Sequence, residues 1–219
     1  MYGTVAIQAN IMHLASQKEH ITMKIIGITG GVGAGKSQVL DYLEEKYHAR
    51  ILKADQLAND LKLPGQICYQ RLVDHFGTGI LDAEGYIDKG KFAMLIFGDE
   101  TALQFVNRVV HPAVKESILS QLEEEKKKGV VSYFFIEAAL LIENKYDEIC
   151  DELWYIYADE KVRRERLKES RGYSEEKIQQ IYDSQLNEAE FRKHCQVVID
   201  NGGSLEQTYA QIDEQLEDK

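Results

Sequence analysis

The sequence predicts an α/β fold with a mainly parallel five-stranded sheet, on two observations. Five short apolar runs are spaced along the chain, and amphipathic helical patterns separate them. A strand, a helix and a further strand form a right-handed crossover, which makes the strands parallel and covers both faces of the sheet with helices. The predicted strands are 24–28, 49–53, 130–136, 153–157 and 196–199.

The first strand runs into a glycine-rich loop, Gly30-Gly31-Val32-Gly33-Ala34-Gly35-Lys36-Ser37, and a helical pattern follows from Gln38 to Glu45. The loop fills every fixed position of G-x-x-x-x-G-K-[ST], the phosphate-binding motif. Its backbone amides surround phosphate oxygens, Lys36 reaches the β- and γ-phosphates, and the Ser37 hydroxyl ligates Mg²⁺. An accidental glycine-rich turn is disfavoured because a strand and a helix flank the motif. We therefore predict a three-layer P-loop NTPase fold that binds a nucleoside triphosphate.

The second predicted strand ends just before Asp55, which places this carboxylate at the carboxyl end of the sheet, beside the phosphate loop. A carboxylate there can accept the proton of an attacking hydroxyl and orient it for in-line phosphoryl transfer. Asp55 is also a suitable N-cap for a helix from Gln56 to Leu61, and the two roles are compatible.

The long segment between the second and third strands carries several helical patterns, among them 91–97 and 102–110. We predict a helical insertion over about residues 56–128 that receives a second substrate. Pro64 and Pro112 are expected to interrupt its helical patterns. Its last residues, three acids followed by three bases from Glu123 to Lys128, are typical of an exposed helix end.

A basic segment from Lys161 to Arg171 follows the fourth strand of this otherwise acidic chain. We interpret about residues 160–185 as a lid in which at least one arginine stabilises the charge of the transferred phosphoryl group. The alternative is a solvated helix whose Glu165 and Glu169 neutralise the neighbouring bases.

The bulk properties limit the possible partners. A chain of 219 residues with 44% hydrophobic content suits one α/β domain. Its net charge of −11 argues against nucleic acid or a membrane surface as a partner, and no apolar run approaches the ~18 residues of a membrane span. Cys68, Cys150 and Cys195 lack metal-binding spacing and are typical of reduced thiols in a cytoplasmic protein.

The first 22 residues lack the features of a secretory signal. We predict a poorly ordered extension over 1–22, before a working domain over 23–219. The alternative is a helix from Ile7 to Ala15, although caps are absent from its ends.

Three patterns imitate a GTPase. Residues 144–147 match the guanine-reading motif N-K-x-D, and residues 74–77 and 82–85 both match D-x-x-G. The context disfavours a GTP-dependent switch, because N-K-x-D should end a core strand and here precedes the strand 153–157. Neither D-x-x-G match follows a predicted buried strand.

From about Met23 onward, the chain closely resembles the dephospho-CoA kinase family. Beyond the phosphate loop, the resemblance is carried in chain order by Ala54-Asp55, Phe76-Gly77, Gly85-Tyr86-Ile87-Asp88, Val110-His111-Pro112, Leu140-Leu141-Ile142-Glu143, Ser170-Arg171-Gly172-Tyr173-Ser174, Gln185 and Ile199-Asp200-Asn201-Gly202. Such ordered agreement is far more specific than the phosphate loop alone.

The resemblance implies a cytoplasmic kinase that uses ATP and Mg²⁺ to phosphorylate the ribose 3′-hydroxyl of dephospho-CoA. It implies that Asp55 is the general base and binds the acceptor, and that His111 helps to form the acceptor pocket. It also places Arg171 in the lid and Asn201-Gly202 beside the adenine of ATP. A P-loop kinase for another nucleoside or nucleotide is the alternative.

Two departures from the family pattern concern the site itself. Lys53 stands where the family's D-A-D motif has its first Asp, and Glu137 and Ala139 replace the Asp and Pro of D-x-P-L-L-x-E. Glu137 ends the third predicted strand, where its carboxylate can meet Mg²⁺ through water. We expect a divergent but active family member, with an inactive CoA-binding sensor as the alternative.

Overall fold

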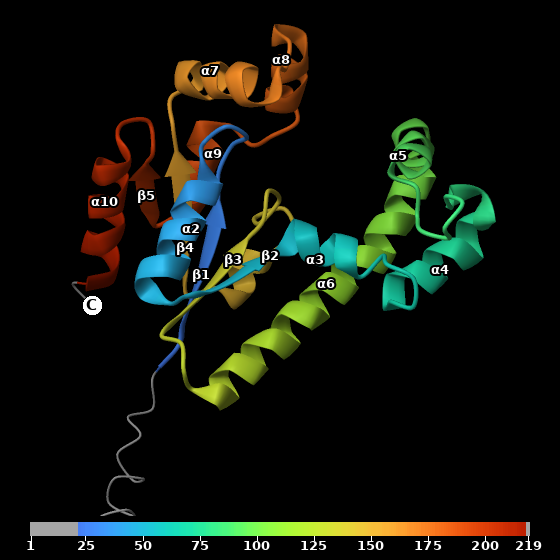
Figure 1. The fold of residues 1–219 in the computed structure, drawn as a ribbon, viewed down its shortest axis with the longest axis horizontal. Coiled ribbons are helices and arrows are strands. Elements are labelled where there is room, and N and C mark those ends of the chain that lie inside the picture. Colours follow the sequence, from blue (N-terminus) through green and yellow to red (C-terminus); the bar gives the residue numbers. More distant parts are fainter. Residues whose placement is uncertain (1–21, 218–219) are drawn as a thin grey trace, which may run out of the picture.

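The computed structural model describes residues 22–217 (Figure 1). Nearly all of the expected N-terminal extension, including the alternative helix from Ile7 to Ala15, lies outside the described residues. The described part forms one five-stranded parallel sheet with the order β2-β3-β1-β4-β5. Its strands are β1 (Lys24–Thr29), β2 (Arg50–Lys53), β3 (Tyr133–Glu137), β4 (Glu152–Tyr157) and β5 (Val197–Asp200). All five predicted strands are confirmed, and the largest boundary difference is at β3, which begins three residues later than expected.

Helices cover both faces of the sheet and also form an arm at one side of it (Figure 1). The helices are α2 (Lys36–Tyr47), α3 (Ala54–Asp60), α4 (Ile67–Phe76), α5 (Lys89–Gly98), α6 (Glu100–Lys128), α7 (Glu160–Arg171), α8 (Glu175–Asp183), α9 (Glu188–His194) and α10 (Leu205–Glu217). Short 3₁₀ helices occur at Thr78–Ile80 and Tyr146–Ile149.

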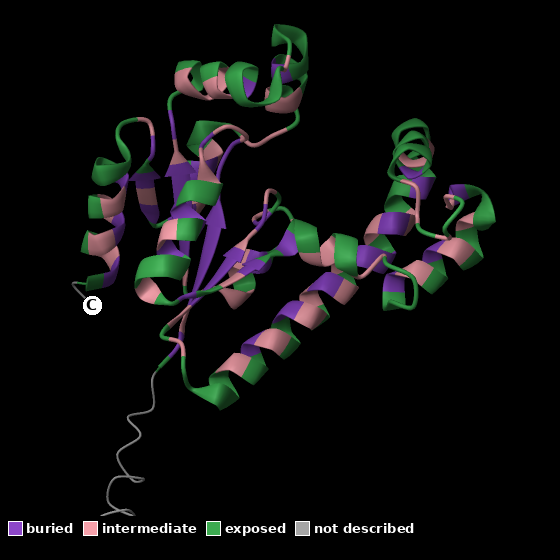
Figure 2. Cartoon of the chain, in the orientation of Figure 1, coloured by how far each residue is buried: buried purple, intermediate pink, exposed green. Residues whose placement is uncertain are grey.

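Two hydrophobic cores form because the side chains of β1 alternate between the faces of the sheet. Ile26 and Ile28 pack on the face covered by α2 and α10, whereas Ile25 packs on the face that includes α6 and α9. Figure 2 shows this burial as purple strands in the centre, with the green surfaces of the helices turned outward. Burial on both faces explains why the strands appear in the sequence as nearly continuous apolar runs.

The segment between β2 and β3 is helical, and its longest element is α6, with 29 residues. The Asp99 side chain caps its start by accepting hydrogen bonds from the Thr101 and Ala102 amides, and Gly129 in the left-handed conformation ends it. The expectation that Pro112 interrupts the pattern is wrong. Buried valines on both sides of the proline, such as Val110 and Val114, hold the helix against the core.

No described helix combines the length and the apolar character that crossing a membrane requires.

Two neighbouring residues of α6 offer a matched test of this packing. Ile118 is 0% exposed, and Leu119 is 42% exposed on the outer side of the helix. Because Ile118→Ala leaves a cavity, we expect the free energy of unfolding to fall by about 2–5 kcal/mol. Leu119→Ala should change it by about 0.5 kcal/mol or less. Denaturant unfolding measures both values, and equal losses would contradict the assigned helix face.

Candidate active site

The phosphate loop lies between the carboxyl end of β1 and the first turn of α2, as the motif predicts. Gly35 adopts a left-handed conformation with φ 84° and is the N-cap residue of α2. A β-carbon at Gly31 would collide with the Arg163 guanidinium, and one at Gly35 with the Asn201 amide. At Gly35 the left-handed backbone itself favours glycine, whereas at Gly31 the absence of a side chain lets the Arg163 guanidinium approach the loop closely.

The Lys36 ammonium group has two partners in the loop region, the Gly30 carbonyl and the Glu137 carboxylate. Its Nζ donates to the Gly30 carbonyl at 2.7 Å and lies 3.9 Å from Glu137 Oε1. The side chains of Lys36 and Glu137 are only 16% and 14% exposed. Burial lowers the pKa of Lys36, and the negative charges of Glu137 and Asp55 oppose that change. Lys36 and Glu137 therefore share one poorly solvated site, and the exposed Asp55 lies within electrostatic range of both.

Glu137 ends β3 and lies beside both neighbouring strands of the sheet. Burial raises the pKa of its carboxyl, the positive charges of Lys36 and Lys53 oppose this rise, and the charge of Asp55 adds to it. Lys53 is the register partner of Glu137 across the β2–β3 ladder. The two residues that depart from the family pattern are thus direct neighbours with opposite charges.

Asp55 lies in the first turn of α3, immediately after β2. The expectation that it caps this helix is wrong, because α3 begins at Ala54, two residues before the expected Gln56, and Lys53 occupies the cap position. Buried Ala54 continues the core directly from strand into helix, so Lys53 is both the last residue of β2 and the N-cap of α3. Within residues 22–217, the Asp55 side chain forms no hydrogen bond or ion pair, so its carboxylate is available to a substrate hydroxyl.

Helices α7 and α8 lie beyond the carboxyl ends of the strands, over the phosphate loop (Figure 1). The Arg163 guanidinium contacts Gly31 and lies 4.5 Å from the centre of the Tyr182 ring. Its Nε is buried and has no hydrogen-bond partner. Gln185 Oε1 accepts a hydrogen bond from the Val32 amide at 3.1 Å. The sequence did not single out Arg163 among the basic residues of this segment.

Arg171 is exposed at the end of α7. Its positive charge contributes, with that of Arg163, to the lowered pKa of Lys36. Arg163 and Arg171 of α7 are therefore both close enough to Lys36 to act on its charge. The role of Arg171 toward ATP stays a prediction.

Asn201 follows β5, and its side chain contacts the phosphate loop. Its Nδ2 donates to the Ala34 carbonyl at 2.8 Å, and its Oδ1 accepts from the Thr208 hydroxyl at 2.9 Å. Arg166 Nη2 donates to the Asn201 carbonyl at 2.8 Å. Asn201 and Thr208 are 1% and 0% exposed. The sequence pointed to Asn201-Gly202 but missed Thr208 and Arg166, which are distant along the chain and match no motif.

His111 is half-buried in α6, and burial lowers the pKa of its imidazole. It forms no hydrogen bond or ion pair within the described residues. Its predicted part in an acceptor pocket stays a prediction.

The donor set at the loop is compatible with Mg²⁺ held mainly by a nucleotide. Ser37 presents an exposed hydroxyl in the first turn of α2, and no group of three metal-ligating acidic, His or Cys side chains occurs among residues 22–217. Mg²⁺ retains several waters and takes few protein ligands where substrate phosphates coordinate it. Ser37 fits that arrangement.

Residues 24–207 match the family model described as dephospho-CoA kinase. The chain belongs to the dephospho-CoA kinase family. A dephospho-CoA kinase of Carboxydothermus hydrogenoformans is 35% identical over 192 residues, which cover 88% of this chain and 92% of the relative. One from Aquifex aeolicus is 38% identical over 193 residues, with coverage of 87% and 94%.

Solved structures give the same fold. A protein from Thermus thermophilus superposes with a TM-score of 0.77 at 27% identity and covers 90% of this chain and 98% of its own. A dephospho-CoA kinase from Campylobacter jejuni superposes with a TM-score of 0.67 at 20% identity, with coverage of 89% and 96%. The predicted P-loop fold is confirmed. The GTPase-like patterns lie in turns and at the end of α4, away from the strand ends where guanine readers occur.

The Asn201 network can be tested by Thr208→Val, which keeps the shape of the side chain and removes its hydroxyl. The buried Asn201 Oδ1 then loses its donor, so the amide is less firmly held against Ala34. We expect the KM for ATP to rise by about fivefold to tenfold, with little change in the KM for the acceptor. Thr101→Val, at an exposed residue of α6, is the control. A larger rise in the acceptor KM than in the ATP KM would contradict this role.

Proposed function

We propose that this protein transfers the γ-phosphoryl group of ATP to the ribose 3′-hydroxyl of dephospho-CoA and releases CoA and ADP. The observation that carries the proposal is the free Asp55 carboxylate. It shares an electrostatic site with Lys36 of the phosphate loop, in a chain of the dephospho-CoA kinase family. The identity of the acceptor follows from the family, and the groups that the transfer needs are present in the site.

Asp55 accepts the proton of the 3′-hydroxyl as the oxygen attacks the γ-phosphorus. The bond between that phosphorus and the β–γ bridging oxygen breaks, and its electron pair leaves with ADP. Most of the rate enhancement in such transfers comes from positioning and charge stabilisation. Asp55 is well placed for the first of these tasks because no side chain within residues 22–217 competes for its carboxylate.

Lys36 and Arg163 supply the positive charge. In the present structure, Lys36 Nζ bonds to the Gly30 carbonyl, and a short movement of this flexible side chain would bring it to the β- and γ-phosphates. Phosphate oxygens there would keep the ammonium protonated against the effect of its burial. The Arg163 guanidinium, which contacts Gly31 and forms no ion pair within residues 22–217, would neutralise charge on the transferred group.

We propose Mg²⁺ as the metal, held by the Ser37 hydroxyl and reached by Glu137 through water. When bound there, Mg²⁺ would neutralise the negative charge that develops during the transfer. We also propose that the enzyme works in the cytoplasm, which agrees with three free cysteines in the described chain.

The acceptor is tested by measuring ADP release with dephospho-CoA, AMP, CMP and uridine offered separately at saturating ATP and Mg²⁺. We expect dephospho-CoA to give the highest kcat/KM, by about 10²-fold or more, because a site built for a larger polar acceptor leaves its groups unpaired with a smaller one. Preferred phosphorylation of another acceptor would replace dephospho-CoA in the proposal. Binding of dephospho-CoA without turnover would indicate a sensor.

Asp55→Asn tests the general base. The amide keeps the size of the side chain but cannot take the proton, so we expect kcat to fall by about 10²-fold or more with the KM for ATP nearly unchanged. Asp41→Asn, an exposed position on α2, is the matched control. Turnover at the wild-type rate in Asp55→Asn would remove this residue from the mechanism.

A further inference from the structure

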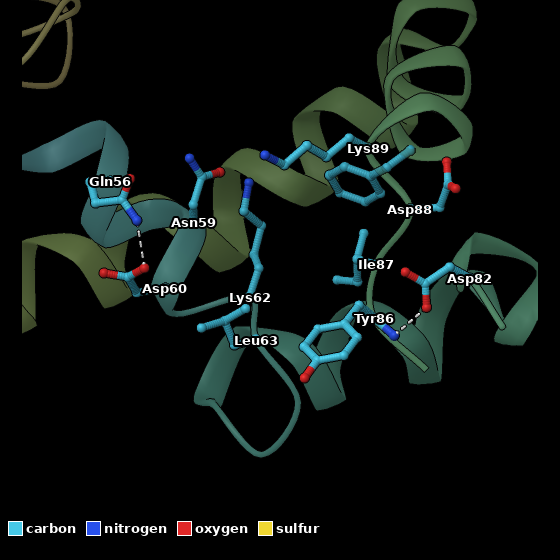
Figure 3. A pocket seen from close by; sticks show the side chains of 11 residues that line it. Gln56, Asn59, Asp60, Lys62, Leu63, Asp82, Tyr86, Ile87, Asp88 and Lys89 are labelled. Carbon is cyan, nitrogen blue, oxygen red and sulfur yellow. Dashed lines mark hydrogen bonds between the residues drawn. The ribbon is translucent and has the colours of Figure 1, made fainter. Parts of the chain in front are cut away.

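A cleft of about 470 Å³ lies in the helical arm that follows Asp55. Its walls come from α3, from the chain between α3 and α4, and from the chain that leads into α5 (Figure 3). This volume lies within the usual range for a small-molecule site. The cleft is separate from the phosphate loop, none of whose residues line it.

Two lysines extend into this cleft toward the same place. In Figure 3, the ammonium groups of Lys62 and Lys89 approach each other, and the side-chain amide of Asn59 lies beside them. Lys62 is half-buried and lies 5.9 Å from the centre of the Phe92 ring. Neither lysine forms a hydrogen bond or an ion pair with its side chain within residues 22–217.

The carboxylates of the cleft have other partners. Asp82 accepts hydrogen bonds from the Glu84 and Tyr86 amides, and Asp88 accepts one from the Lys91 amide at the start of α5. Asp60 accepts a hydrogen bond from Gln56 Nε2 at 2.8 Å. Figure 3 shows Asp82 and Asp88 across the cleft from the two ammonium groups. The lysines therefore remain without a neutralising carboxylate.

Two unpaired cations at short range repel each other, and an anion between them removes the repulsion. The pKa of Lys62 reflects this proximity. Burial lowers the pKa of Lys62, and the positive charge of Lys89 lowers it further. The charge of Asp55 opposes this change, so the Lys62 ammonium lies within electrostatic range of the proposed base.

Dephospho-CoA carries a diphosphate on the 5′-oxygen of the same ribose whose 3′-hydroxyl is phosphorylated. With that hydroxyl at Asp55, the diphosphate lies one sugar ring away, and the nearby unpaired cations of the arm are Lys62 and Lys89. We propose that these two lysines, with the Asn59 amide, bind the 5′-diphosphate of the acceptor. This assignment rests on the proposed function and adds the residues that recognise its substrate.

The remaining walls suit the rest of that molecule. Leu63 and Tyr86 line the cleft and are 45% and 49% exposed, so both offer apolar surface to a ligand. The pantetheine arm continues from the diphosphate and can cover them. Lysine is appropriate at the anion because its ammonium acts as a mobile point charge toward phosphate.

Lys62→Met and Lys89→Met test this assignment, because methionine keeps an unbranched stem and removes the charge. Each should raise the KM for dephospho-CoA by about tenfold, the loss of one charge-assisted hydrogen bond, while kcat and the KM for ATP stay within about twofold. Lys62→Arg should restore most of the affinity. The exposed α6 residue Lys127→Met is the matched control.

An unchanged KM for dephospho-CoA in both methionine variants would overturn the assignment and leave the proposed function intact. An equal rise in the KM for ATP would also overturn it, because the charges would then act on both substrates or on the fold. If the wild-type protein does not phosphorylate dephospho-CoA, both proposals fail. Steady-state kinetics at two ionic strengths separates the cases further, since the variants should show a weaker salt dependence.

Discussion

The parallel pairing of β1, β3 and β2 is the constraint on which the site depends. In this register Glu137 is the partner of Ile28 in β1 and of Lys53 in β2. The phosphate loop, Glu137 and Asp55 are consequently brought to one edge of the sheet, although the chain separates them widely. A slip of one residue would turn each side chain to the opposite face and would bury charge in a hydrophobic core. The burial of β1 on both faces therefore protects the geometry of the proposed catalytic groups.

Electrostatic balance within this edge explains why the two departures from the family pattern are tolerable. A lysine at 53 alone would place a cation beside the proposed base, and the carboxylate of Glu137 lies directly across the ladder from it. Glu137 also lies next to Lys36, so its one negative charge partly neutralises two positive charges. Because its pKa is raised by burial, Glu137 is sensitive to any change in those neighbours. We interpret Lys53 and Glu137 as a compensating pair rather than as two independent losses.

The sequence predicted those parts of the structure that depend on local pattern. The strands followed from apolar runs, the loop from a contiguous motif, and the location of Asp55 from its position after a strand. Local pattern failed at Pro112, where the packing of distant residues outweighs a proline within a helix. It also missed Thr208 and Arg163, whose importance arises from contacts with the loop across many residues of chain. Pairs such as Lys62 and Lys89 have no spacing rule, because the fold alone brings them together.

The distribution of charge over an acidic chain connects these separate findings. The net charge of −11 repels ATP and dephospho-CoA at long range, so binding needs local positive sites that are not already neutralised. Cations such as Lys46, Lys115 and Arg164 are engaged in ion pairs. Within residues 22–217, Arg163 at the loop and Lys62 and Lys89 in the cleft have no such partner. Arg163 therefore offers an unpaired cation where ATP phosphates would bind, and Lys62 and Lys89 offer two where the acceptor diphosphate would. On an otherwise acidic surface, two local basic sites would favour polyanions whose phosphates reach those sites over polyanions that meet only the acidic surface.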